Sequence, residues 1–484
     1  MNDNESTSGA QPQAGKPGFV RALGLVPATA INMTQMVGIG PFITIPVILA
    51  TMGGPQAMLG WILGAVLAMA DGQIWAELGA AMPSSGGSYV YLREAYQYWT
   101  GKLAPFLFVW TTLLATPLTM STGMIGIANY ISYFVPSLTP LELHFIAVGF
   151  TVITVALLYR RIDSIAQITK FLWVGMIITV LMIIIAGATH FKANLAFDFP
   201  ANAFSLTPQF FLGLGAGMGI SIYDYLGYYS AAYLGDEVKR PGRVIPLSII
   251  ISILAVAVID LSISVVSVGV VPWREAAQSL TIGSLVMQRT WGSTAATIMT
   301  VLIILTAFAS GYTGLLAGSR LPYNAAKDGL FFRQFGVLHK RMSFPHISLL
   351  VMGLITAIGC FLNLQTLINT MVAATILVQF IGQIGALFIL RYKQPKLRRP
   401  YREFLHPLCS IIALAGWIYV FFTSPSPSVP LAVGWVVLGI VAYLIWAYFE
   451  KVWPFRPIEV HEAFIGAESR DGEVDVSAEL SSAD

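Results

Sequence analysis

Long apolar stretches alternate with short polar loops from residue 21 to residue 449 of the chain. Each stretch approaches the roughly 20 residues that an α-helix needs to cross a bilayer. The pattern predicts an all-α polytopic membrane protein with twelve transmembrane helices. The predicted spans are 21–50, 56–81, 103–133, 142–160, 165–188, 208–234, 244–270, 282–319, 346–363, 367–391, 405–422 and 430–449.

Glycine clusters interrupt the apolar pattern of the first and the sixth predicted span. The first contains Gly38 and Gly40 followed by Pro41, and the sixth contains alternate glycines over 213–219 and then Gly227. A helix that is broken inside hydrocarbon leaves backbone groups unpaired, and this is tolerated only where protein or a watery cavity shields them. Two such breaks are typical of the substrate site of a secondary transporter.

The spacing of the two breaks predicts an internal repeat. Five spans separate the equivalent points, and an odd number of helices per repeat places the two repeats in opposite orientations in the membrane. We expect a ten-helix transport core over 19–392, made of a first repeat at 19–190 and a second at 205–392. Helices 11 and 12, over 403–450, then lie outside the repeat.

Composition and charge agree with a membrane protein and give its orientation. The chain is 56% hydrophobic and 11% charged, whereas soluble domains have about a quarter charged residues. With the N-terminus inside, all but Lys192, Arg274 and Arg289 of the 27 Lys and Arg residues fall on the cytoplasmic side. We therefore expect a multi-pass protein of the cell (plasma or inner) membrane with both termini in the cytoplasm.

Three polar segments outside the spans add detail to this topology. The N-terminal tail, 1–18, and the acidic tail, 455–484, are expected to be disordered in the cytoplasm. The basic loop at 391–400 is interpreted as a topology anchor, with binding of anionic lipid as the alternative.

Three further motifs follow the second, sixth and eighth spans. They read ELGAAMPSSGGSYVY at 77–91, EVKRPGRVIP at 237–246 and SRLPYNAAKDGL at 319–330. Together with the break in the first span, they resemble the amino acid–polyamine–organocation transporter family, with features of its polyamine-uptake and L-type amino acid branches. The resemblance implies the LeuT-type fold, a 5+5 inverted repeat with discontinuous helices 1 and 6.

The resemblance also implies a substrate site at the first break. There Met36, Val37, Gly38, Ile39 and Gly40 would present backbone groups to the substrate. The N–H groups at the end of a half-helix suit a carboxylate. Relatives have Gly-Ser-Gly where this chain has Gly38-Ile39-Gly40, and the following proline has no N–H to donate. That weaker anion site would fit a polyamine, although Ile39 and Gly40 still carry N–H groups.

The second break supplies the other candidate residues. By the resemblance, Tyr223 falls on the family's aromatic gate, and Leu226 and Gly227 fall on its break. Asp224 departs from the family, where a small or neutral residue is usual. We consider three roles for it: pairing with a cationic substrate, carrying the coupling proton, or forming a salt bridge within the protein. Surrounding tyrosines suit either cation–π contacts or plain helix packing; they are Tyr223, Tyr225, Tyr228, Tyr229 and Tyr233.

Charged residues elsewhere are candidates for coupling and gating. Glu77 ends the second span and is expected to pair or to cap the helix. Arg320, with Lys327 and Asp328, lies on the loop predicted after the eighth span. By the resemblance, a charge network there would lock the inward gate; the alternative is a topology signal on a solvated loop. The resemblance implies that Lys170 in the fifth span could replace a coupling sodium ion; the alternative is a lysine that snorkels to the membrane edge.

Other polar side chains inside the spans leave the coupling ion open. The hydroxyls of Ser310 and Thr313 in the eighth span are possible sodium ligands, so coupling to sodium stays possible beside coupling to protons. Asp71 and Asp260 are intramembrane acids that should face the bundle interior, where either could relay protons.

The sequence as a whole predicts a secondary active permease that moves an amino acid or related amine by proton symport or exchange. The alternatives are a polyamine transporter and a non-transporting amino acid sensor on a transporter fold. An enzyme is not expected, because no span holds a Ser/His pair and no His/Cys cluster has metal-ligand spacing. The expected partners are the substrate, protons or sodium, and the lipid bilayer, with no cofactor, resident metal or nucleic acid.

Overall fold

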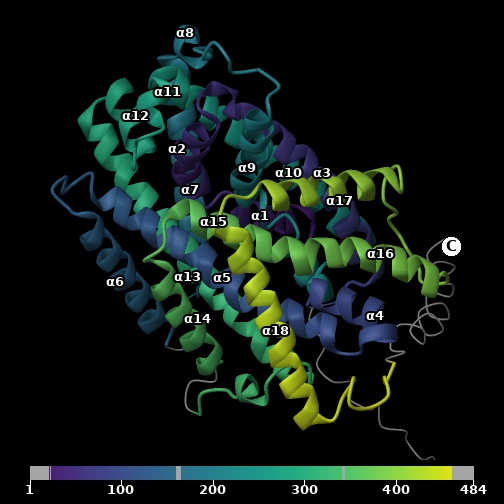
Figure 1. The fold of residues 1–484 in the computed structure, drawn as a ribbon. Coiled ribbons are helices and arrows are strands. Elements are labelled where there is room, and N and C mark those ends of the chain that lie inside the picture. The colour runs from purple at the N-terminus through teal and green to yellow at the C-terminus, as the bar shows by residue number, and fades with distance from the viewer. Residues whose placement is uncertain (1–20, 22, 85, 160–164, 341–343, 461–484) are drawn as a thin grey trace, which may run out of the picture.

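A computed structural model describes residues 21, 23–84, 86–159, 165–340 and 344–460, without the side chains of 165–173 (Figure 1). This part of the chain is nearly all helical, and its β pairing is one isolated bridge between Leu23 and Val238. The helices are α1 (Leu25–Met36), α2 (Gly40–Met52), α3 (Met58–Ala81), α4 (Ser88–Thr100), α5 (Leu103–Ile131), α6 (Pro140–Leu158), α7 (Ile165–Thr189), α8 (Ala193–Ala196), α9 (Pro208–Tyr225), α10 (Pro241–Val270), α11 (Trp273–Ala276), α12 (Ile282–Thr290), α13 (Ser293–Lys327), α14 (His346–Gly359), α15 (Leu364–Thr375), α16 (Ile381–Lys393), α17 (Leu408–Thr423) and α18 (Ser428–Glu450).

The lengths and compositions of these helices identify a multi-pass membrane protein. Among the described residues, seven helical segments are long and apolar enough to cross a membrane, or eight if the bent pair α1 and α2 counts as one span. In α6 and in α18, only 22% of the most apolar 18-residue stretch is buried inside the protein. The outer faces of these two helices are therefore suited to lipid contact.

Both predicted breaks are present in the structure. Helix α1 ends at Met36 and α2 begins at Gly40, and their axes differ by 47°. Pro41 stands in the first turn of α2, where its missing N–H costs no helical hydrogen bond. Helix α9 ends at Tyr225 because Leu226 is extended and Gly227 has a φ of +117°, a conformation that favours glycine.

Two boundaries differ from the sequence prediction. The predicted span 282–319 consists of two helices, α12 and α13, because Gly292 with a φ of +87° turns the chain between them. Helix α13 then continues to Lys327, so Arg320 and Lys327 lie on a helix and the predicted loop is wrong there. Helix α4 was not predicted, because a half-polar helix has no apolar run of spanning length.

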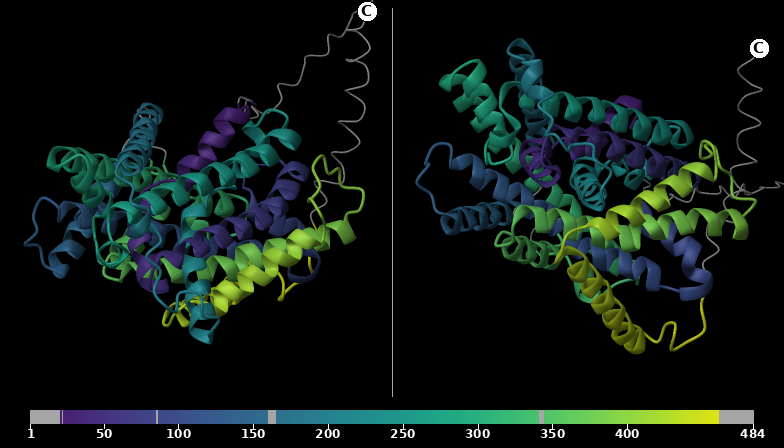
Figure 2. Two further views of the ribbon diagram at one scale, coloured as in Figure 1. Left: turned by 90° about the horizontal axis from the view of Figure 1, so that it is seen from above. Right: turned by 45° about the horizontal axis from the view of Figure 1, so that its top comes forward.

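The broken helices lie inside the bundle. Helix α1 packs on α10, α2 packs on α9, and α3 packs on both α9 and α10. Helix α5 packs on α13 and α15 across the site, while α6 and α14 lie side by side at one edge (Figures 1 and 2). The short helices α8, α11 and α12 gather at one end of the molecule in Figure 1. This arrangement surrounds the two breaks with buried apolar side chains from the helices packed around them.

Candidate substrate site between the broken helices

The two breaks contact each other directly. A Cβ atom added to Gly227 would lie 2.7 Å from Cβ of Gln35 and 3.3 Å from the backbone nitrogen of Met36. A Cβ atom added to Gly40 would collide with Oδ1 of Asp224. Both positions therefore require the small size of glycine, and the end of α9 lies against the gap between α1 and α2.

The gap between α1 and α2 leaves three backbone donors free. The N–H groups of Gly38, Ile39 and Gly40 have no hydrogen-bond partner among the described residues, whereas the N–H of Val37 still bonds to the Met33 carbonyl at 2.9 Å. These free donors stand at the positive end of the α2 dipole, a position that favours a bound anion.

The side chains around the gap are apolar. Met36, Val37 and Ile39 are buried, and Ile39 packs against Gly126 of α5. Ile39 therefore contributes packing between the gap and α5. On the other side of the gap, half-buried Leu226 ends α9 with its N–H bonded to the Ile222 carbonyl at 3.0 Å.

Asp224 is buried beside the gap without a cationic partner. Its Oδ2 accepts a hydrogen bond of 2.6 Å from the Thr44 hydroxyl of α2, and its Oδ1 has no partner and faces Gly40. No described Lys, Arg or His forms an ion pair with it. Of the three roles considered, a salt bridge within the described part of the protein is therefore wrong.

The tyrosines divide into two groups, and only one lies near Asp224. The Tyr223 hydroxyl lies 2.5 Å from the Thr122 hydroxyl of α5, and the Tyr225 hydroxyl donates to the Trp61 carbonyl at 3.2 Å. The prediction that all five surround Asp224 is wrong, because the turn at Gly227 directs the chain away. The remaining three gather with Trp75 and Asp71 of α3; they are Tyr228, Tyr229 and Tyr233.

The other two intramembrane acids face the interior, as predicted, but in different environments. Asp71 accepts hydrogen bonds from the Tyr228 hydroxyl at 2.5 Å and from the Trp417 indole at 3.0 Å. Asp260 of α10 is fully buried, and neither of its oxygens has a partner among the described residues.

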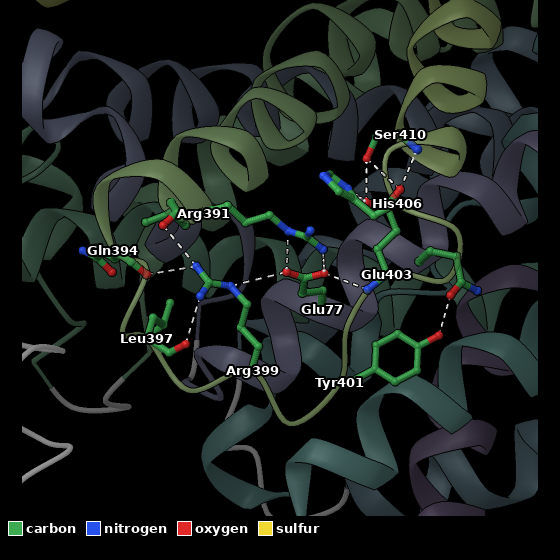
Figure 3. Close-up of polar contacts among 11 residues, drawn as sticks. Glu77, Arg391, Gln394, Leu397, Arg399, Tyr401, Glu403, His406 and Ser410 are labelled. Atoms are coloured by element: carbon green, nitrogen blue, oxygen red, sulfur yellow. Dashed lines mark hydrogen bonds and ion pairs between the residues drawn. The ribbon is translucent and has the colours of Figure 1, made fainter.

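Glu77 of α3 is the centre of a cluster of ion pairs (Figure 3). Its buried carboxylate accepts hydrogen bonds from Arg391 at 3.0 and 2.5 Å and from the Glu403 N–H at 2.7 Å, and it lies 3.4 Å from Arg399. The prediction that Glu77 pairs is confirmed. Sequence reasoning missed its partners, because the basic loop at 391–400 was interpreted as an anchor.

The same cluster extends to the start of α17. Glu403 accepts from the backbone N–H and hydroxyl of Ser410 at 2.6 and 2.7 Å, and lies 2.5 Å from His406 Nδ1. Arg399 donates to the carbonyls of Leu390, Leu397 and Gln394. Burial lowers the pKa of the Arg399 guanidinium, and the Glu77 carboxylate opposes that effect. The cluster thus fixes the connection from α16 to α17 on α3.

The predicted network around Arg320 is not observed. Arg320 is exposed on α13 and forms no ion pair with a described residue. Nζ of Lys327 lies 5.1 Å from the centre of the Tyr323 ring, and Asp328 accepts a hydrogen bond from the Tyr89 hydroxyl of α4. A phenol–carboxylate contact therefore joins the first and third motifs.

The structure describes the side chains of two of the three residues considered for ion coupling. The side chain of Lys170, on α7, lies outside the described residues. The hydroxyl of Ser310 on α13 borders the helix break, since a Cβ atom at Gly38 would lie 2.9 Å from it. The Thr313 hydroxyl donates instead to the Ala309 carbonyl of its own helix at 2.9 Å.

Comparison with known proteins identifies one family and several relatives that match most of this chain. The family model described as amino acid permease matches residues 23–449. The human cystine/glutamate transporter is 27% identical over 443 residues, covering 89% of this chain and 86% of the relative. The methylthioribose transporter of Bacillus subtilis (strain 168) is 24% identical over 459 residues, covering 90% and 95%. The aspartate-proton symporter of the same bacterium is 26% identical over 443 residues, covering 85% and 80%.

Proposed function

Because this chain belongs to the amino acid permease family, we propose that it is a secondary active transporter that moves an amino acid across the cell membrane by alternating access. One observation supports this proposal above others. Two helix breaks meet inside the bundle and bring free backbone N–H groups beside a buried carboxylate that has no cationic partner among the described residues. Membrane transporters use such breaks to bind small charged solutes.

The proposed architecture has twelve spans. A first repeat at 19–190 and a second at 205–392 would be related by inversion, and the helices over 403–450 would lie outside them. Support comes from the short apolar helices Val174–Thr189, His346–Gly359 and Leu408–Thr423, which supplement the longer spans. The distribution of Lys and Arg supports placing both tails, 1–18 and 455–484, in the cytoplasm.

The proposed binding mode uses both charges of an amino acid. The substrate carboxylate would accept hydrogen bonds from the N–H groups of Gly38, Ile39 and Gly40. Its ammonium would lie toward Asp224 and the carbonyl end of α9, where the helix dipole is negative. The site would be shaped by Met36, Val37, Leu226 and Gly227. A polyamine has no carboxylate for the free donors, so the polyamine alternative is not favoured.

Proton coupling is the proposed source of energy, and the named aspartate-proton symporter among the relatives supports it. Asp224 would carry the charge that changes. Tyr223 would act as a gate, because its contact with Thr122 links α9 to α5 across the site. Glu77 would hold α3 in place from the cytoplasmic end. The roles of Lys170, Arg320 and a sodium ion at Ser310 stay predictions.

A counterflow experiment tests the proposal. Purified protein in proteoliposomes is loaded with each unlabelled amino acid in turn, and uptake of the same labelled compound is measured against empty liposomes. Putrescine, spermidine and methylthioribose are assayed in parallel. We expect trans-stimulated uptake of at least one amino acid. Binding of amino acids without any flux would contradict the proposal in favour of a sensor, and flux of polyamines alone would contradict the amino acid assignment.

A further inference from the structure

The connection between α16 and α17 carries an excess of exposed positive charge. Residues 393–407 lead from the end of α16, which closes the spanning segment Leu364–Lys393, to the start of the apolar helix α17. The acid of this connection, Glu403, is buried and bonded to Ser410. Four of its cations are exposed and form no ion pair with a described residue; they are Lys393, Lys396, Arg398 and Arg402.

Inward-facing side chains hold the same connection in place. Arg391 and Arg399 bond to the buried Glu77 of α3, and Arg399 also donates to three backbone carbonyls nearby (Figure 3). The Tyr401 hydroxyl donates to Gln73 of α3. Because these bonds fix the backbone, the exposed cations would lose less conformational entropy when they bind a ligand. A plain topology signal requires positive charge but not such a scaffold.

A second basic segment lies against this connection. A Cβ atom added to Gly242, at the start of α10, would lie 2.5 Å from Cβ of Pro400, so the two segments touch. The start of α10 adds exposed cations that form no ion pair with a described residue; they are Lys239, Arg240 and Arg243. These three residues and the four exposed cations of the connection form the basic surface. The acids just before them, Asp236 and Glu237, leave it an excess of positive charge.

Exposed apolar side chains border the basic surface at the facing ends of α16 and α17. Tyr392 is 81% exposed and Phe404 is 66% exposed, and they are joined by exposed leucines at 405 and 408. The ring of Phe388 on α16 lies 5.2 Å from the ring of His406, so the two helix ends lie side by side here (Figure 1). Cations beside exposed aromatic and aliphatic side chains are typical of the interface between a membrane and water.

Lys393 joins the charged and the apolar parts of this region. Its Nζ lies 5.4 Å from the centre of the Trp99 ring, 5.7 Å from that of Tyr98 and 5.9 Å from that of Tyr392. Trp99, on α4, is itself an exposed side chain. An ammonium group among outward-facing aromatic rings is favoured at the level of the lipid headgroups, because the rings are amphipathic and the lysine stem is apolar.

We propose that the basic surface binds the phosphate headgroup of an anionic phospholipid, whose acyl chains lie on the exposed apolar side chains of α16 and α17. Arg and Lys donate charge-assisted hydrogen bonds to phosphate oxygens, and each cation near a membrane surface attracts anionic lipid. A lipid held there would bridge the connection and the start of α10. This inference goes beyond the proposed transport function and does not depend on it.

The acidic tail of the chain, 455–484, is the other occupant that matches the charge of the basic surface. Its carboxylates would pair with the cations but would leave Tyr392, Phe404 and Leu405 uncovered. A phospholipid covers both the charged and the apolar side chains, since its headgroup and its acyl chains are joined. The combination of the two kinds of side chain therefore favours the lipid.

Native mass spectrometry of the full chain in neutral detergent tests the inference. Dioleoylphosphatidylglycerol and dioleoylphosphatidylcholine have the same acyl chains and differ in net charge, and we expect the wild type to bind the first more tightly. Arg398→Gln combined with Arg402→Gln should weaken binding of phosphatidylglycerol at least about tenfold, equivalent to about 1.4 kcal/mol. Lys192→Gln combined with Lys340→Gln is the matched control, since it removes the same charge from exposed side chains on other loops, and it should bind as the wild type does.

Four results would overturn the lipid site. Equal affinity of the wild type for the two lipids would do so without any variant, and so would unchanged affinity in the double arginine variant. Displacement of the lipid by inorganic phosphate, at an ionic strength matched with chloride, would assign the surface to a soluble anion. Lipid binding that requires removal of residues 461–484 would assign it to the tail. Because the readout is lipid binding, absence of transport would contradict only the proposed function.

Discussion

The hydroxyl of Thr44 donates a hydrogen bond of 2.6 Å to Asp224 Oδ2, and this contact joins the two broken helices. Thr44 lies one turn into α2, the helix that begins at the first break, and Asp224 lies at the last turn of α9, next to the second break. A change of charge on Asp224 therefore acts directly on the segment that offers free backbone donors. Substrate binding and proton binding would therefore both act on the hydrogen bond between Thr44 and Asp224.

Replacement of Asp224 by asparagine should remove the pH dependence of uptake. The amide keeps a hydrogen-bond acceptor for Thr44 and removes the charge that responds to protons. We expect uptake driven by a pH gradient to fall at least about tenfold, equivalent to about 1.4 kcal/mol. Initial rates of uptake between pH 5 and 8 check this. A wild-type pH profile in the variant would rule out both functional roles of Asp224.

Replacement of Glu77 by glutamine should destabilise the protein. The change leaves the partly buried Arg399 and Arg391 without their carboxylate, and such a loss typically costs 3–5 kcal/mol, or about 3 kcal/mol with this degree of exposure. The melting temperature in detergent measures the effect.

Glu450→Gln is the matched control for Glu77→Gln, since Glu450 pairs with an Arg333 side chain that is 83% exposed. An exposed pair of this kind contributes about 0–1 kcal/mol. Equal losses of melting temperature in the two variants would contradict the role given to the buried cluster.

The contact between Tyr89 and Asp328 should contribute measurable coupling energy. Burial raises the pKa of the Tyr89 phenol, and Asp328 adds to the rise, so the phenol remains a donor at neutral pH. A double-mutant cycle of Tyr89→Phe and Asp328→Asn should give a coupling of about 1–2 kcal/mol in the free energy of unfolding. Additive effects would show that the first and third motifs are not linked through this pair.

The sequence predicted features whose cause is local. Pro41 and Gly227 constrain the backbone at their own positions, so the two helix breaks could be located before any coordinates. Burial of Asp71 and Asp260 followed equally from their place in apolar spans.

Features that depend on packing between distant segments could not be predicted in the same way. Glu77 and Arg391 are 314 residues apart, and nothing in the basic loop distinguishes an arginine that turns inward from one that faces solvent. Tyr228 and Tyr229 follow Asp224 closely in sequence, but the positive φ of Gly227 directs them to α3. Sequence proximity therefore gave the wrong neighbours for Asp224.

The substitution Gly40→Ala tests the central claim most directly, because the added methyl group would collide with Asp224 Oδ1 between the two breaks. Gly149→Ala on α6 is the matched control, since a methyl group there meets nothing within 4 Å. The measurement is amino acid counterflow in proteoliposomes with equal amounts of folded protein. We expect Gly40→Ala to lose at least about tenfold in rate, equivalent to about 1.4 kcal/mol, and Gly149→Ala to match the wild type. Wild-type counterflow in Gly40→Ala would contradict a substrate site between the broken helices.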